Sequence, residues 1–142
     1  MERLPTIVSD IMSSPVVTID KGATVREAVQ LMTKKRIGSI VITDNDGPVG
    51  IITERDVLER VVSPCKDPRI TETGEIMSSP LITIPREKGI LEAMREMREH
   101  DISRLVVMDK GTIVGIMSEK DVIRAVSISS LTSFSTLLRR RS

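Results

Sequence analysis

Aromatic residues are almost absent from this chain. Phe134 is the only phenylalanine, and neither tryptophan nor tyrosine occurs. Proteins hold single-stranded nucleic acid largely by stacking bases on aromatic rings, so the composition disfavours that function. Neither sign of charge is in excess, with 21 basic residues against 20 acidic ones. A dedicated nucleic-acid binder carries a broad basic field, which this composition does not predict.

Cysteine and histidine are equally scarce, with Cys65 and His100 the only examples. One cysteine cannot form a disulfide within the chain, and one histidine cannot build a multi-histidine zinc site. We therefore expect no metal site. No apolar run reaches the length of a membrane span, and the N-terminus lacks the apolar stretch of a signal peptide. The sequence accordingly predicts a cytoplasmic protein that binds no membrane.

A gapless internal repeat is the main feature of the sequence. Residues 11–15 read Ile-Met-Ser-Ser-Pro and recur at 76–80, while the segment 50–57 recurs in similar form at 115–122. The offset is 65 residues in both cases. Two copies are too few for an open solenoid. The repeat therefore predicts two similar halves that pack with approximate two-fold symmetry.

Both halves show the same order of expected elements. In the first, an apolar run at 16–19 precedes a helical pattern that Thr24 is suited to cap. A hairpin at 40–52 follows, with its turn at 44–48, and Thr53 opens a second helix. The predicted fold class is therefore α+β, built from two β-α-β-β-α repeats.

The expected division of the chain follows from this repeat. Repeat 1 spans residues 8–63 and repeat 2 spans 73–127, with a linker at 64–72. Residues 128–142 form a C-terminal tail in which apolar residues recur at helical spacing before three arginines. A short amphipathic helix on a subunit or partner, an anion- or membrane-contacting tail and a disordered segment all fit this pattern. We favour the contact with a subunit or partner.

The junction between each hairpin and its following helix carries a shared set of side chains. Thr53 and Ser118 open the helices, and Asp56 and Asp121 follow three residues later. This spacing suits an N-terminal capping box, which is a structural role. It also suits a nucleotide, because a helix N-terminus attracts phosphate and an Asp can accept hydrogen bonds from a ribose diol. A basic residue precedes both acids, which capping alone does not require.

These motifs resemble those of the cystathionine-β-synthase-type (CBS) domain family. Residues 10–15 read Asp-Ile-Met-Ser-Ser-Pro, residues 75–80 repeat them with Glu for Asp, and the closing Gly-h-h-Thr/Ser-x-x-Asp occurs twice. The resemblance extends over residues 8–126. It implies a disc-like module of two repeats whose sheets pack together. Two clefts between the repeats then commonly hold AMP, ADP, ATP or S-adenosylmethionine.

The resemblance also implies a role for each matched side chain. It assigns the ribose to Asp56 and Asp121, and the hydroxyl beside ribose and phosphate to Thr53 and Ser118. It assigns phosphate to Arg55, Lys120 and Arg104. The adenine shelf, which varies more within the family, comprises Thr18, Ile19, Ile37 and Gly38 together with Thr83, Ile84, Ile102 and Ser103.

The two clefts are not expected to bind nucleotide with equal affinity. Repeat 1 has Ser39 where repeat 2 has Arg104. Because clefts of this family draw phosphate ligands from both repeats, we expect Arg104 and Lys120 to serve the nucleotide whose ribose Asp56 holds. The cleft built on Asp121 then binds more weakly or stays empty. S-adenosylmethionine ranks below AMP, ADP and ATP, because its sulfonium cation gains little from basic side chains.

The resemblance thus implies a regulatory module that requires no cofactor. It would bind adenosine nucleotides, form a homodimer and signal energy or nucleotide state to an effector protein that the sequence does not identify. A protein-interaction scaffold without ligand is one alternative, and nucleic-acid binding through the clefts and basic tail is a weaker one. An enzyme needs a nucleophile, a general base or a metal cage. The junction residues bind but are not poised for chemistry, so we expect no catalytic activity.

Overall fold

The computed structural model describes residues 5–127, which fall into two compact units. We call Val16–Ile82 the central unit. The described parts of Met1–Pro15 and Thr83–Ser142 make up the terminal unit. The expected C-terminal tail at 128–142 lies outside the described residues.

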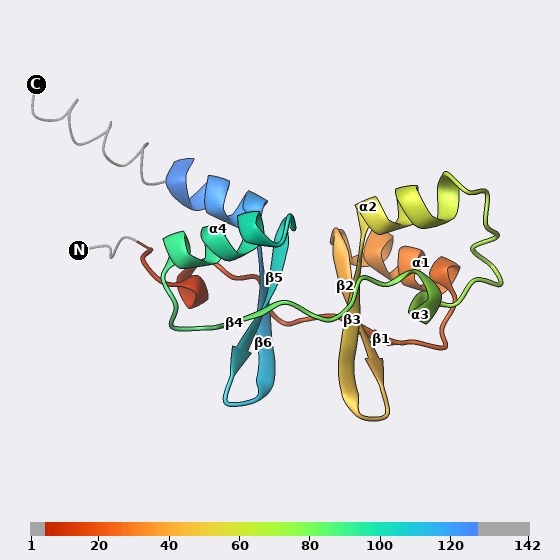
Figure 1. The fold of residues 1–142 in the computed structure, drawn as a ribbon, viewed down its shortest axis with the longest axis horizontal. Helices are drawn as coiled ribbons and strands as arrows, with labels where there is room; N and C mark the ends of the chain where they lie inside the picture. Colours follow the sequence, from red (N-terminus) through yellow and green to blue (C-terminus); the bar gives the residue numbers. More distant parts are fainter. Residues whose placement is uncertain (1–4, 128–142) are drawn as a thin grey trace, which may run out of the picture. The chain divides into compact units, whose positions relative to one another are not determined.

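Each unit holds one three-stranded sheet with helices on one of its faces (Figure 1). The elements of the central unit are β1 (Thr18–Asp20), α1 (Val25–Lys35), β2 (Ser39–Asp44), β3 (Gly47–Thr53), α2 (Glu54–Val57), the π-helical turn η2 (Leu58–Val62) and α3 (Thr73–Ile76). Those of the terminal unit are the 3-10 turn η1 (Val8–Asp10), β4 (Thr83–Pro85), α4 (Ile90–Glu99), β5 (Arg104–Asp109), β6 (Thr112–Ser118) and a helix at 119–127.

The two sheets share one topology, which confirms the predicted β-α-β-β-α order. β1 runs parallel to β2, and β2 pairs antiparallel with β3. β4, β5 and β6 repeat this arrangement. Gly47 begins β3 directly after the first hairpin turn and Gly111 lies in the second turn, at φ values of 119° and 79°. These are positive angles that glycine adopts without steric cost.

Local chemistry explains where α1 begins. The Thr24 side chain accepts a hydrogen bond from the Glu27 amide at 3.2 Å, and the Glu27 carboxylate accepts one from the Thr24 amide at 2.9 Å. This reciprocal pair satisfies amides that the first helical turn leaves without partners. Thr24 is therefore the N-cap that the sequence predicts.

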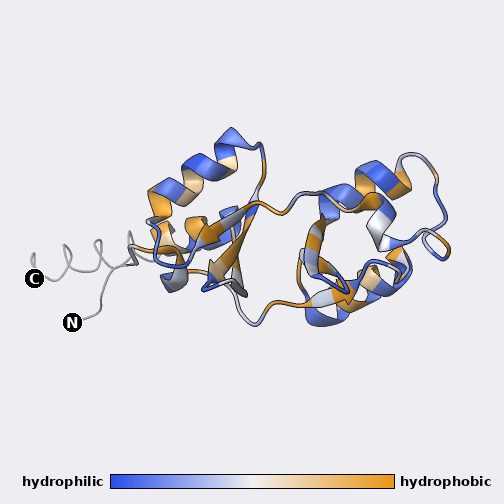
Figure 2. Ribbon diagram, turned by 60° about the horizontal axis from the view of Figure 1, so that its bottom comes forward, coloured by the Kyte–Doolittle hydropathy of each residue, from blue (hydrophilic) through white to orange (hydrophobic). Residues whose placement is uncertain are grey.

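The core of the central unit lies between its sheet and α1. Figure 2 shows hydrophobic residues concentrated on the strands. Val25, Ala28 and Met32 form the buried stripe of α1 and meet buried isoleucines of β2 and β3. Helical residues at spacings of three and four share one face, so the amphipathic pattern directs this stripe onto the sheet.

The expected linker at 64–72 packs closely on the central unit. The carbonyls of Thr71 and Pro68 accept hydrogen bonds from the amides of Val25 and Arg26, at 2.8 and 3.0 Å. The segment therefore supplies partners for the free amides of the first turn of α1. Within it, hydrogen bonds from Arg69 lower the pKa of Asp67 below its ordinary value.

We call residues 10–15 and 75–80 the opening motifs of the two repeats. Neither opening motif pairs with a strand of its own sequence repeat. Ser78 exchanges backbone hydrogen bonds of 2.8 and 3.0 Å with Ile51 of β3, and Ser13 does the same with Ile116 of β6. Ile76 is buried in the core of the central unit. The compact units therefore cut across the sequence repeats, since each is completed by the opening motif of the other copy.

Candidate functional site

In the central unit, the junction between β3 and α2 is a closed network around one carboxylate. The amide and the hydroxyl of Thr53 donate to Oδ2 of Asp56 at 2.9 and 3.1 Å. The Asp56 amide donates back to the Thr53 hydroxyl oxygen at 3.3 Å. Asp56 is only 6% exposed. The capping role is therefore present, and it fixes the orientation of the acid at the start of the helix.

The second carboxylate oxygen of Asp56 contacts residues of the opening motif. The Ser78 hydroxyl donates to Oδ1 at 2.9 Å, and Nε of Arg60 lies 3.9 Å from the same oxygen. Arg60 also donates to the carbonyls of Ile76 and Met77, at 2.9 and 3.0 Å. Arg60 thus contacts both Asp56 and the opening motif at 75–80. Sequence reasoning missed both Arg60 and Ser78 as site residues, although the repeated Met-Ser-Ser-Pro was visible.

The terminal unit contains a second copy of this network. The amide and hydroxyl of Ser118 donate to Oδ2 of Asp121 at 2.8 and 3.0 Å, and the Asp121 amide donates back at 3.2 Å. Ser13 takes the place of Ser78, with a longer distance of 3.4 Å to Oδ1. Nη1 of Arg124 lies 3.9 Å from Oδ1 of Asp121, although Arg124 is the repeat counterpart of Glu59 and not of Arg60. The carboxylate of Asp121 is buried to the same degree, at 7% exposed.

A glycine permits the close approach of each opening motif to its strand. A Cβ at Gly50 would lie 2.5 Å from Sδ of Met77 and 2.9 Å from the carbonyl oxygen of Ser78. At Gly115 the corresponding distances to Met12 and to the Ser13 carbonyl are 2.6 and 3.0 Å. Non-bonded carbon atoms prefer separations of about 3.5–4.0 Å. The glycine of the Gly-h-h-Thr/Ser-x-x-Asp motif is therefore needed for the motif to dock.

The basic residues expected to bind phosphate lie in different settings. Arg55 is exposed and forms a 2.9 Å ion pair with Glu59, one helical turn along. Exposed pairs of this kind contribute little free energy. Lys120 is exposed at the start of the 119–127 helix. Arg104 begins β5 directly opposite Ser118 of β6, so that both side chains lie on the same face of the hairpin.

The residues of the expected adenine shelf are only partly brought together. The carbonyl of Gly38 accepts from the Glu54 amide at 3.2 Å, and that of Ser103 accepts from the Glu119 amide at 3.0 Å. These two positions therefore adjoin the helix starts. Thr18 and Thr83 are exposed on the first strands, Ile19 and Ile37 pack against the core of the central unit, and Ile84 is buried. Ile102 instead lines a separate groove.

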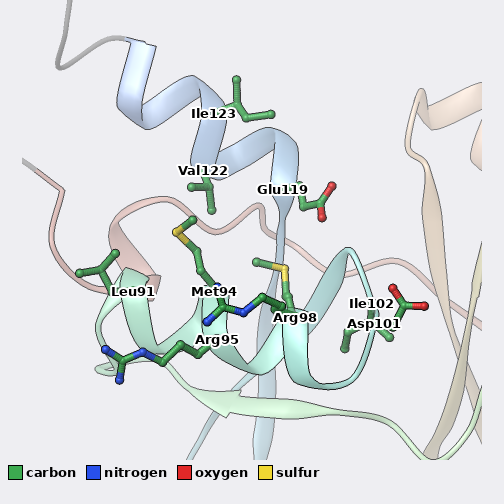
Figure 3. A pocket seen from close by; sticks show the side chains of 10 residues that line it. Leu91, Met94, Arg95, Arg98, Asp101, Ile102, Glu119, Val122 and Ile123 are labelled. Carbon is green, nitrogen blue, oxygen red and sulfur yellow. The ribbon is translucent and has the colours of Figure 1, made fainter.

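This groove lies in the terminal unit between α4 and the 119–127 helix, and has a volume of about 650 Å³ (Figure 3). Apolar side chains dominate it. Leu91 and Ile123 are 70% and 64% exposed at its rim, and Met94 and Val122 also line it. Arg95, Arg98 and Glu119 add charge around the apolar surface. Within residues 5–127 no cluster of His, Cys, Asp and Glu has the arrangement of a metal site.

The sequence profile of the CBS domain matches the chain twice, at residues 8–63 and 74–128. The chain therefore belongs to the CBS-domain family, and it is a CBS-domain pair, which is a class of regulatory module. The described helices include none with the length and apolar character of a membrane span.

Individual relatives agree with this assignment. The chain is 36% identical over 119 residues to the uncharacterized protein MK0525 of Methanopyrus kandleri, covering 82% of this chain and 61% of that protein. A structure of an uncharacterized conserved protein from Pyrococcus horikoshii has a TM-score of 0.80 at 29% identity, covering 88% and 95% of the two chains. The CBS domain protein PAE2072 from Pyrobaculum aerophilum, solved in complex with AMP, has a TM-score of 0.76 at 32% identity, covering 89% and 98%.

Proposed function

We propose that this chain binds adenosine nucleotides at the two junctions and signals their occupancy to another protein. The observation that carries the proposal is the duplicated, buried acid, Asp56 or Asp121, fixed at a helix start beside a basic residue. Such a site combines a ribose acceptor with an N-terminus that favours phosphate. The AMP complex of PAE2072 supports adenosine as the nucleoside of the ligand.

Regulation by such a module is a matter of linked equilibria. A nucleotide shifts an effector only if it binds the chain with different affinity when the effector is in each of its two states. The Thr53–Asp56–Ser78 network connects a ligand at the helix start to the segment that enters the next strand. That segment is our candidate for carrying the signal out of the central unit.

Calorimetric titration with AMP, ADP, ATP and S-adenosylmethionine tests the proposal. We expect saturable binding of at least one adenosine phosphate and weaker binding of S-adenosylmethionine. A titration without binding heat for all four would contradict nucleotide sensing. The junctions would then act as helix caps, and the protein-interaction scaffold would become the better explanation.

Arg104 is predicted to recognise phosphate and to contribute little to the nucleoside. Replacing it with alanine should weaken ATP binding about 3- to 10-fold, less than a buried hydrogen bond to a charged group would cost, because solvent screens a partly exposed charge. Adenosine binding should change less than about twofold, since neutral adenosine offers no charge to the guanidinium. Titration of both ligands against wild type and Arg104→Ala measures this, with Arg26→Ala, an exposed arginine of α1, as the control. Equal losses for ATP and adenosine would contradict a phosphate role.

A second copy of the chain is the partner that we propose for the apolar groove. Contiguous exposed apolar surface is typical of protein interfaces, and Leu91 and Ile123 are both largely exposed there. Ile123→Glu should therefore shift the chain toward monomer in light scattering coupled to size exclusion. Ile70→Glu is the matched control, because Ile70 is 77% exposed but lies away from the groove lining. An unchanged mass for Ile123→Glu would place any self-association elsewhere.

A further inference from the structure

The first serine of each opening motif, Ser13 or Ser78, contacts the buried acid of a junction. The family signature does not explain this contact. Ser78 lies in the segment that pairs with β3, and its hydroxyl reaches Oδ1 of Asp56 at 2.9 Å. Ser13 holds the same place beside Asp121. The two serines come from equivalent positions of the 65-residue repeat. A contact made independently in both units calls for a common reason.

The hydrogen-bonding capacity of Asp56 is largely used within the protein. A carboxylate offers about four lone-pair sites over its two oxygens. Oδ2 accepts two bonds from Thr53, and Oδ1 accepts one from Ser78. About one acceptor site on Oδ1 remains. A ribose diol presents two hydroxyl donors, so Asp56 alone cannot accept both while its internal bonds persist.

The Ser78 oxygen provides the missing acceptor. A carboxylate oxygen can only accept hydrogen bonds, so the Ser78 hydroxyl must be the donor in its bond to Asp56. The lone pairs of the Ser78 oxygen therefore stay available to accept a hydrogen bond. Oδ1 and Oγ are 2.9 Å apart, a separation close to that of two neighbouring hydroxyl oxygens on a sugar ring. Ser78 is only half-buried and Ser13 is exposed, so both oxygens lie where a ligand can approach.

From this geometry, and given the nucleotide binding proposed above, we infer that an Asp–Ser pair recognises the vicinal diol of the nucleotide. Asp56 Oδ1 takes one ribose hydroxyl and Ser78 Oγ takes the other, with Asp121 and Ser13 forming the second pair. The pair selects ribonucleotides over deoxyribonucleotides. It also makes each serine, contributed by the opening motif of the other sequence copy, part of the ligand site.

The test compares a double variant with a matched control. Ser13→Ala/Ser78→Ala removes both proposed acceptors, while Ser14→Ala/Ser79→Ala changes the adjacent exposed serine of each motif. Each protein is titrated with ATP, 2′-deoxy-ATP and 3′-deoxy-ATP, after thermal melting shows that it is folded. Wild type and control should lose about 2- to 12-fold in affinity when the hydroxyl that faces the serine is removed, the range for one neutral hydrogen bond.

In Ser13→Ala/Ser78→Ala, ATP should bind more weakly than to wild type. The preference for ATP over the deoxy-ATP that lacks the serine-facing hydroxyl, which we call the discrimination, should fall below about twofold, because the protein partner of that hydroxyl is gone. A purely structural serine would weaken all three ligands by the same factor and leave the discrimination intact, which would overturn the inference. If the alanine double variant does not fold, Ser13→Thr/Ser78→Thr replaces it, because threonine keeps the hydroxyl. This variant should keep the discrimination, and a loss of discrimination would overturn the inference. Wild type that binds none of the three would overturn the proposed function and this inference together.

Discussion

Asp56→Ala should weaken nucleotide binding at the central unit by about 10- to 100-fold, the loss expected when hydrogen bonds to a charged group are removed. The same change leaves the Thr53 amide and the Ser78 hydroxyl without their acceptor. Unfolding free energy should therefore fall as well, by about 1–3 kcal/mol. Calorimetric titration and urea denaturation measure the two effects separately.

The stability loss makes a control essential. Asp46→Ala removes an equal charge from the exposed hairpin turn and should change neither binding nor unfolding appreciably. Asp121→Ala tests the second site and should cause the smaller loss of affinity, if the sites differ as the sequence predicts. Equal losses at the two acids would contradict that asymmetry. Full binding by a folded Asp56→Ala protein would contradict the ribose role of the acid.

Gly50→Ala should destabilise the central unit by about 1–3 kcal/mol, which is the usual cost of forcing an extra carbon into a packed site. The added Cβ would meet the Ser78 backbone oxygen at 2.9 Å. A side chain can rotate away, but this carbonyl is held by its hydrogen bond to Ile51. The opening motif must therefore move, and nucleotide affinity should fall together with stability.

Gly89→Ala is the matched control for this substitution. Its Cβ would find no atom closer than 3.7 Å, so its cost should be that of an N-cap change alone, about 0.5–1 kcal/mol. Denaturant titration of the two variants distinguishes a steric effect from a general glycine effect. If Gly50→Ala were as stable as wild type, the close approach of Met77 and Ser78 would not be a constraint on the fold.

Local signals in the sequence were sufficient to predict the regular elements. The 3.6-residue period located α1, Thr24 was correctly expected to cap it, and the turn residues located the first hairpin. The capping geometry of Thr53 and Asp56 also followed from spacing alone. Each of these features depends on residues close together in the chain, whose interactions obey simple local rules.

The partners of the opening motifs could not be predicted in the same way. A repeat shows that 11–15 and 76–80 are equivalent, but it does not show which hairpin each segment joins. Ser78 meets Asp56 across 22 residues and Ser13 meets Asp121 across 108. Such pairings are decided by tertiary packing. The serines and Arg60 therefore entered the site only when the fold was known.

The exchange of opening motifs makes the central unit an insertion within the terminal unit. A fragment covering Val16–Ile82 retains Ile51, Asp56 and Ser78 in one continuous piece. A fragment cut at the repeat boundaries 8–63 would lack the strand partner and the buried Ile76. In evolutionary terms, a single ancestral copy arranged in this way would need the opening segment of a second copy. A chain with two copies supplies both opening segments, so the two copies complete each other's folds.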